Sequence, residues 1–199
     1  MLTFTVTVGG LVGLAAGFFG GLVDDLLMRL TDVVFAFPAL VLMLVLVAAL
    51  GPSLQNVVIA LSLVSWAELA RVVRADVLRV RELDFVAASR GLGASGPRVA
   101  LRHVLPSAVG PLLSLVVLQM GSLPIVAGTL SFLGLGAPLG FADWGQLISL
   151  AQGWIQGPPG RPFAYWYVTL FPGLCIVLYS LGWNLLGDAL SDAFDPRNR

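Results

Sequence analysis

The sequence has 199 residues and no formal net charge, with 58% hydrophobic and only 11% charged residues. A soluble domain usually carries about 25% charged residues, so this composition indicates a membrane protein, and a net charge of zero gives no long-range attraction to nucleic acid. The single cysteine, Cys175, excludes an intrachain disulfide, and with one histidine in the chain there is no Cys/His metal cluster.

Runs without charged residues predict the membrane spans. A bilayer core is crossed by about 20 apolar residues in a helix. The uncharged run 33–67 is too long for one crossing, and Gly51-Pro52 breaks it. The predicted fold class is therefore an all-α, polytopic membrane helix bundle. We expect five spanning helices, near 3–22, 33–50, 55–74, 107–128 and 163–187.

The first span carries Gly9, Gly13, Gly17 and Gly21, each four residues apart. Such a ladder of small residues lets a neighbouring helix approach closely, so we expect this span to have a close helical neighbour. The polar stretch 24–32 follows, with apolar residues between its charges. It predicts a short helix at the membrane interface that leads into the second span.

The arginines set the predicted orientation. The sequence has no lysine, and of its 11 arginines Arg161 alone lies away from segments 24–32 and 75–106, their flanks and the C-terminal tail. Basic residues gather on the cytoplasmic side of membrane proteins. We therefore expect these segments to be cytoplasmic, and 51–55 and 129–162 to face outward.

The outward segment 129–162 is more than a simple loop. Trp144, Leu147, Ile148 and Ala151 have helical spacing, and Trp144 suits a membrane interface. We expect an amphipathic helix here. It either shields the bundle or forms a functional contact surface, and the sequence leaves both open.

The cytoplasmic segment 82–106 predicts two short helices joined by a glycine turn. Residues 82–92 include good helix formers, and Gly93 follows as a stop because a positive φ costs glycine little. Ser95 is a candidate N-cap for a second helix over 96–104, and Pro106 marks the return to the membrane. Two such helices form a compact knob that transmits a rigid push. The alternative is an ordinary basic loop beside lipid headgroups.

Residues 85–106 read FVAASRGLGASGPRVALRHVLP. The pattern resembles the cytoplasmic coupling loop of binding-protein-dependent ABC import permeases, E-A-A-x3-G-x9-I-x-L-P, which docks into a groove of the ATPase subunit. Three positions depart from it: Ala87 replaces Glu, Ser89 replaces Ala and His103 replaces Ile. Packing and shape must then carry more of the contact than a carboxylate. The resemblance implies that the ATPase-coupling residues are Ala87, Ala88, Ser89, Arg90, Gly93, His103, Leu105 and Pro106.

The resemblance extends over essentially the whole chain. The runs LARVVRADVL, LSFLGLGAP and LFPGLCIVLYSLGWNLLGDALSDAFDPR are similar to the second permease subunit of dipeptide, oligopeptide and nickel importers. This implies a type I ABC importer transmembrane domain, here a single domain over 1–199 with its coupling loop at 82–106. Family members usually have another span before the point where this chain begins, so the resemblance also implies that a sixth, N-terminal span is missing and that the gene starts upstream. That additional helix would then be the close neighbour of the glycine ladder.

The resemblance also implies the setting and the partners. These permeases reside in the bacterial or archaeal cytoplasmic membrane. They assemble with a homologous second permease, two ATP-binding subunits and an extracytoplasmic solute-binding protein, besides membrane lipid. Peptides are the expected solute, while nickel, glutathione and glycosides stay open.

No catalytic, cofactor or metal site is expected in the chain itself. A phosphate-binding loop of the form G-x-x-x-x-G-K-[ST] is impossible without lysine, so the chain is not expected to hydrolyse ATP itself. No enzymatic activity is expected of it. One alternative function is a secondary transporter or channel subunit, which needs polar groups near mid-membrane, where these spans offer little besides Glu68. The other alternative is an inactive, truncated permease that merely inserts into the membrane.

Overall fold

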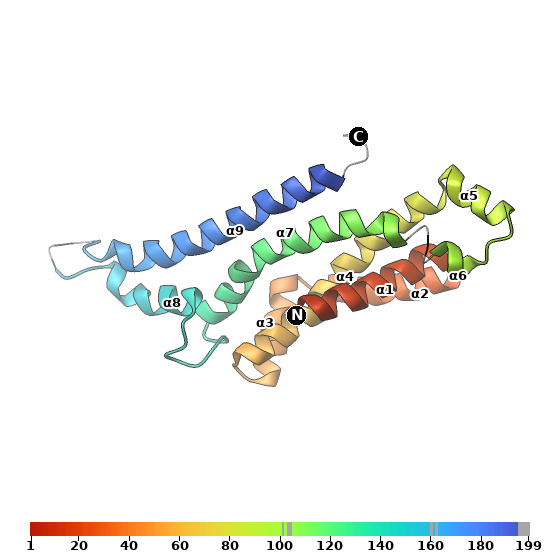
Figure 1. Ribbon diagram of the computed structural model, residues 1–199. Helices are drawn as coiled ribbons and strands as arrows, with labels where there is room; N and C mark the ends of the chain where they lie inside the picture. The colour runs from red at the N-terminus through yellow and green to blue at the C-terminus, as the bar shows by residue number, and fades with distance from the viewer. Residues whose placement is uncertain (101, 103–104, 160, 162, 195–199) are drawn as a thin grey trace. The chain divides into compact units, whose positions relative to one another are not determined.

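A computed structural model describes residues 1–199 except 101, 103–104, 160, 162 and 195–199 (Figure 1). In the described residues four helices are each long and apolar enough to cross a membrane, and α2 with α3 passes as one further, broken span. The expected all-helical chain of about five spans is thereby confirmed. The helices are α1 (Leu2–Phe19), α2 (Gly21–Phe35), α3 (Ala39–Leu50), α4 (Leu54–Arg81), α5 (Asp84–Gly91), α6 (Gly96–Val99), α7 (Leu105–Phe132), α8 (Trp144–Ile155) and α9 (Trp166–Phe194).

The chain divides into two compact units. The first unit comprises Met1–Ala39, Ser62–Val116 and Gly187–Arg199, and the second comprises Leu40–Leu61 and Val117–Leu186. The first therefore holds α1, α2, most of α4 and the predicted coupling segment. The second holds α3, α8, most of α9 and both segments that the arginine pattern predicts outside.

In the first unit the glycine ladder of α1 packs directly on α4. A Cβ added at Gly13 would lie 2.5 Å from the Ala70 carbonyl oxygen, and one added at Gly17 would lie 2.7 Å from Val77 Cγ1. The absence of side chains at these positions is what lets the two backbones approach. The neighbour of the ladder is therefore α4, and the expectation that an additional helix fills this role was wrong. Gly21 stands outside the ladder and opens α2 with a φ of +53°.

Two predicted helix boundaries differ from the structure for the same local reason. The expected interfacial helix 24–32 is longer, since α2 extends to Phe35, and the second span begins only at Ala39 rather than at 33. Pro38 cannot continue a helix because its ring removes an N–H donor and clashes with the preceding turn. The pair α2 and α3 thus forms a broken span in place of an uninterrupted helix over 33–50.

The predicted third span also extends further than expected. α4 continues beyond residue 74 to Arg81, because the buried side chains of Val77 and Val80 keep these turns attached to the first unit. This extension places the last turns of α4 directly before the predicted coupling segment.

In the second unit α8 confirms the predicted helix within 129–162. It begins at Trp144, where the Asp143 side chain accepts a hydrogen bond of 2.9 Å from the Gly145 N–H and caps the helix. Gly145 lies against the backbone of Gly128 in α7. α9 is attached to α7 by the Ser180 hydroxyl, which donates to the Gly121 carbonyl oxygen at 2.7 Å.

Candidate functional site

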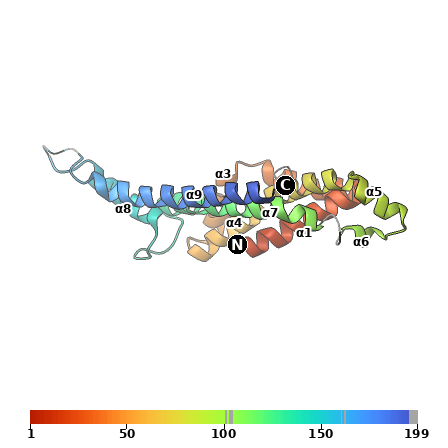
Figure 2. The same ribbon diagram turned by 45° about the horizontal axis from the view of Figure 1, so that its top comes forward.

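The predicted coupling segment forms two short helices that reverse direction just beyond α4 (Figure 2). α5 ends in a turn in which the Ala94 N–H donates to the Ser89 carbonyl oxygen at 3.1 Å, and Gly93 has a φ of +84°. This is the Schellman arrangement, in which the αL residue directly follows the C-cap, here Leu92. A side chain at Gly93 would be strained, so the glycine decides the angle at which α6 leaves α5.

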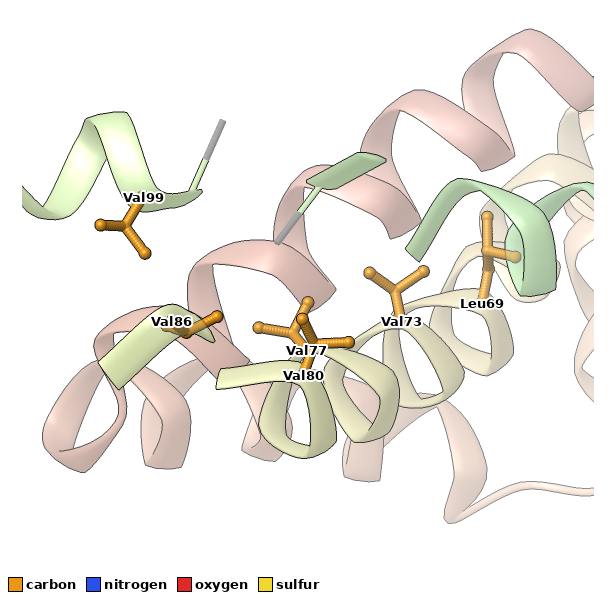
Figure 3. Close-up of a cluster of buried hydrophobic side chains, with 6 residues drawn as sticks. All are labelled: Leu69, Val73, Val77, Val80, Val86 and Val99. Carbon is orange, nitrogen blue, oxygen red and sulfur yellow. The ribbon is translucent and has the colours of Figure 1, made fainter. Parts of the chain in front are cut away.

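Buried valines fix this pair of helices to the end of α4. Val86 of α5 and Val99 of α6 are fully buried, and they join Val77 and Val80 of α4 in one apolar cluster (Figure 3). Phe18 of α1 packs against the same cluster and lies 3.6 Å from a Cβ built on Gly96. The two helices are therefore anchored on α4 and α1, and we name residues 84–99 the knob.

Exposed apolar side chains lie on the knob and directly before it, beside the exposed side chains of Asp84 and Arg98. Leu92 in the turn is 90% exposed, Phe85 is 46% exposed, and Leu83, which directly precedes the knob, is 43% exposed. Around them Arg79 and Arg98 extend their side chains into solvent. A cluster of exposed apolar residues with a charged rim is typical of a surface that a protein partner covers.

The structure places the predicted coupling residues unevenly. Ala87 and Ala88 are exposed on α5, and Ser89 is partly buried. Gly93 forms the turn, and Pro106 is exposed in the first turn of α7. His103 lies outside the described residues. The side chains of Arg90 and Leu105 also lie outside them, although the backbone of Arg90 belongs to α5 and that of Leu105 to α7. The predicted residues from Ala87 to Gly93 thus belong to the knob, whereas Pro106 belongs to α7.

Two ion pairs that the sequence pattern did not predict join α2 to the C-terminal half of α4. Arg74 donates Nε and one terminal nitrogen to the two carboxylate oxygens of Asp24, at 2.5 and 2.6 Å. Arg71 pairs with Asp32 at 2.6 Å, and its guanidinium lies 3.9 Å from the centre of the Phe35 ring. In the sequence the only sign was a complementary order of charges: acids at 24 and 32 face arginines at 74 and 71, as in antiparallel helices.

A further contact ties α1 to the end of α4. Arg81 donates to the Gly17 carbonyl oxygen at 3.0 Å, so the end of α1 gains a cationic partner for its free carbonyls. Together with the ion pairs of α2, this contact attaches both N-terminal helices to the part of α4 that carries the knob. Among the described residues no group of three or more His, Cys, Asp or Glu side chains is arranged to hold a metal ion.

Comparison with known proteins connects this arrangement to a family of transport proteins. Residues 9–199 match the family model described as binding-protein-dependent transport system inner membrane component. The chain is 38% identical over 196 residues to the dipeptide transport system permease protein DppC of Alkalihalophilus pseudofirmus, covering 98% of this chain and 62% of that protein. It is 40% identical over 198 residues to the glutathione transport system permease protein GsiD of Escherichia coli, covering 98% and 63%.

A solved structure shows the same fold. The chain aligns with a chain of the MetNI methionine ABC transporter in inward-facing conformations, with a TM-score of 0.68 over 98% of this chain and 92% of that one, at 20% sequence identity. The present chain spans about three fifths of the length of the curated relatives it matches.

Proposed function

The chain belongs to the family of binding-protein-dependent transport system inner membrane components, and from this premise we propose that it acts as the transmembrane permease subunit of an ABC importer. In this proposal partner ATPase subunits drive peptides across the cytoplasmic membrane through the permease. The similar proteins include permeases named for dipeptide, peptide and glutathione transport, which supports a peptide-like solute.

The rigid attachment of the knob is the observation that carries the coupling role. A push on α5 or α6 reaches α4 through Val86 and Val99, which are fully buried against its last turns. Close-packed apolar side chains transmit displacement because they have little free volume to absorb it. Segment 82–106 is therefore the proposed coupling loop, with Ala87, Ala88, Ser89, Arg90, Gly93, His103, Leu105 and Pro106 as its site residues.

An apolar contact at the tip of the knob fits an ATPase groove. Leu92 is 90% exposed next to the Gly93 turn, and Ala87 offers no carboxylate. Burial of one large side chain stabilises a contact by about 1.5–3 kcal/mol. In this proposal, docking relies on the shape of the knob and on Leu92 rather than on an ion pair at position 87.

The partners follow from the same premise. They are a homologous second permease, two ATP-binding subunits, an extracytoplasmic solute-binding protein and the surrounding lipid. The knob and the C-terminus lie in the cytoplasm, and 51–55 and 129–162 lie outside, because the arginines concentrate on the side of the knob.

Substitution at the turn tests the coupling role. Gly93→Val forces a β-branched residue into a positive φ of +84°, whereas Gly91→Val is the control, since Gly91 is helical and has nothing within 4 Å of its built Cβ. In a reconstituted full-length complex the measured quantity is the number of solute molecules transported per ATP hydrolysed. We expect Gly93→Val to lower this ratio at least about tenfold and Gly91→Val to change it little. Equal effects of the two variants would contradict the role of the turn.

Cysteine crosslinking tests the partner. Cysteines at Ala88 or Leu92, in a Cys175→Ser background because Cys175 is itself exposed, should form a disulfide with cysteines lining the ATPase groove. A cysteine at Leu170, exposed on α9, is the control. An intact complex in which no position of the knob crosslinks would refute docking.

Reporter fusions test the orientation. A reporter inserted at Gly96 should be active in the cytoplasm, and one inserted at Gly157 should be active outside. The opposite pattern would overturn the orientation and the coupling role together.

A further inference from the structure

A pocket of about 270 Å³ in the second unit is lined by a carboxylate among apolar and aromatic side chains. Leu54 contributes from the start of α4 and Ala127 from α7, while Phe141, Asp143 and Trp144 come from the residues around the beginning of α8. The volume is just below the range of about 300–1,000 Å³ found for pockets that enclose drug-sized ligands. The pocket therefore accommodates one end of a ligand rather than a whole ligand.

The carboxylate of Asp143 has no cationic partner among the described residues. Asp143 and Arg161 are the only charged residues in the sequence of the second unit, and the ion pairs of the described residues all involve other side chains. One hydrogen bond reaches the carboxylate, from the Gly145 N–H to Oδ1 at 2.9 Å. A carboxylate offers about four lone pairs, so Asp143 can accept further hydrogen bonds from a ligand.

The cap of α8 does not by itself account for a charge at this position. Asn and Ser satisfy the first N–H groups of a helix as well as Asp does. A helix N-terminus carries about half of a positive elementary charge, so α8 offsets only part of the charge of Asp143. The remaining negative charge favours a cationic ligand in the pocket.

The side chains beside Asp143 suit an ammonium group in particular. Phe141 is 53% exposed and Trp144 is 37% exposed, and both line the pocket. The Trp144 ring packs edge to face on Tyr179 of α9, with the ring centroids 6.3 Å apart. Aromatic faces attract ammonium groups, and Leu54 and Ala127 offer apolar surface for a side chain next to such a group.

A metal ion fits this pocket poorly. A calcium ion takes six to eight oxygen ligands, and among the described residues no group of three or more His, Cys, Asp or Glu side chains could hold a metal ion. An ammonium group has three N–H donors, for which one carboxylate and nearby backbone carbonyls are sufficient partners.

We propose that this pocket binds the free N-terminal ammonium group of the transported peptide, with Asp143 as its counter-ion. The inference rests on the proposed function, which makes peptides the solute and places segment 129–162 outside. It adds a selectivity to that function. A peptide whose N-terminus is acetylated has no charge to pair with Asp143, and its terminal amide is bulkier than an ammonium group.

Neutralisation of the carboxylate tests the proposal. Asp143→Asn removes the charge and keeps the cap of α8, because Asn and Asp are equally good N-cap residues. Arg161→Gln is the matched control, since it removes the other charge of the second unit and Arg161 does not line the pocket.

The probe is the tripeptide alanyl-alanyl-p-benzoylphenylalanine with a free N-terminus, which is photocrosslinked to the full-length permease. The permease is assembled in nanodiscs with its partner permease and both ATPase subunits. The solute-binding protein is left out, so that its own selectivity does not enter the measurement. Trialanine and N-acetyltrialanine then compete with the probe.

In the wild type we expect the adduct to map to the segment that contains Phe141 and Trp144. N-acetyltrialanine should need a concentration at least about tenfold higher than trialanine for half-maximal competition. Arg161→Gln should keep this preference. In Asp143→Asn the two peptides should compete within about twofold of each other, because neither gains an ion pair.

Three outcomes would overturn this inference alone: no adduct in the pocket, equal competition by the two peptides in the wild type, or an undiminished preference in Asp143→Asn. A fourth would do the same. If Asp143→Asn kept the preference but weakened the stimulation of ATP hydrolysis by peptide-free solute-binding protein, Asp143 would contact that protein instead. A wild-type complex that transports no peptide even with its solute-binding protein would overturn the proposed function together with this inference.

Discussion

α4 and α9 are both long apolar helices, of 28 and 29 residues, and both pass as membrane spans. Half of the most apolar window of α4 is buried inside the chain, against 6% of the corresponding window of α9. The two helices therefore have similar hydropathy but very different burial within the chain. Hydropathy reports that a helix suits a bilayer, and lipid is as apolar as leucine. It does not report whether protein or lipid covers the helix.

The cause of the difference lies in what each helix meets. α4 receives the glycine face of α1, two arginine–carboxylate pairs from α2 and the valines of the knob. α9 is joined to α7 through Ser180, and many of its apolar side chains are exposed, including Phe171, Val177 and Leu178. We expect substitutions in and around α4 to be costly in the isolated chain and those on α9 to be mild.

The largest effect is expected where α1 meets α4. Gly13→Leu places a side chain where a Cβ alone would lie 2.7 Å from Val73 Cβ, so α1 cannot keep its position. The free energy of unfolding should fall by about 3 kcal/mol, the upper range for overpacking. Unfolding by denaturing detergent, followed by circular dichroism, measures it. Gly10→Leu is the control, because nothing lies within 4 Å of a Cβ there, and equal losses in both variants would refute the close contact.

The next effect compares one chemical change on the two helices. Leu69 of α4 is fully buried and Leu178 of α9 is 57% exposed. Leu69→Ala leaves a cavity and should cost about 2.5 kcal/mol, while Leu178→Ala should cost less than about 0.5 kcal/mol, as surface substitutions do. The same unfolding assay measures both. Similar costs would mean that α9 is packed as α4 is, and the comparison would fail.

A somewhat smaller effect is expected for the ion pair between α2 and α4. The side chains of Arg74 and Asp24 are 33% and 14% exposed, and removal of one partner leaves a partly buried charge. Arg74→Ala should lower the free energy of unfolding by about 2 kcal/mol. Arg79→Ala is the control, because this arginine is 63% exposed in its pair with Asp76 and such pairs contribute less than about 1 kcal/mol.

A double-mutant cycle isolates that pair. Asp24→Ala in the Arg74→Ala background should add little, because its partner is already gone. Additive losses would show that the two side chains contribute independently and would contradict the pairing.

The smallest effect concerns the attachment of α9. Ser180→Ala removes the buried hydrogen bond to the Gly121 carbonyl oxygen and should cost about 0.6 kcal/mol, the average for such bonds between membrane helices. Ser122→Ala is the control, since the Ser122 hydroxyl donates to the Gln119 carbonyl oxygen within its own helix. A loss for Ser180→Ala above that of Leu69→Ala would reverse the order of the two helices.

Particular residues show how far the sequence reached. Uncharged runs located the spans, and Gly93 was correctly predicted as a turn, because both signals depend on residues near one another in the chain. The second span was predicted as one helix over 33–50, although Pro38 breaks it, and the end of α4 was placed seven residues early. Its extension depends on Val77 and Val80, which are buried against residues from α1, α5 and α6.

The same limit applies to the candidate site. The sequence located the knob but did not identify its exposed leucine, Leu92, or its anchoring by Val86 and Val99.

By itself the sequence determined that the chain belongs in a membrane, roughly where its spans lie and where the segment between α4 and α7 turns. These properties follow from composition, charge and local backbone preference. Only the tertiary structure decided that α4 covers the glycine ladder, that α2 is held by Asp24 and Asp32, and that α9 is left largely exposed. Each of these depends on which distant side chains come into contact, and hydropathy is blind to that choice because protein and lipid are equally apolar partners for a leucine.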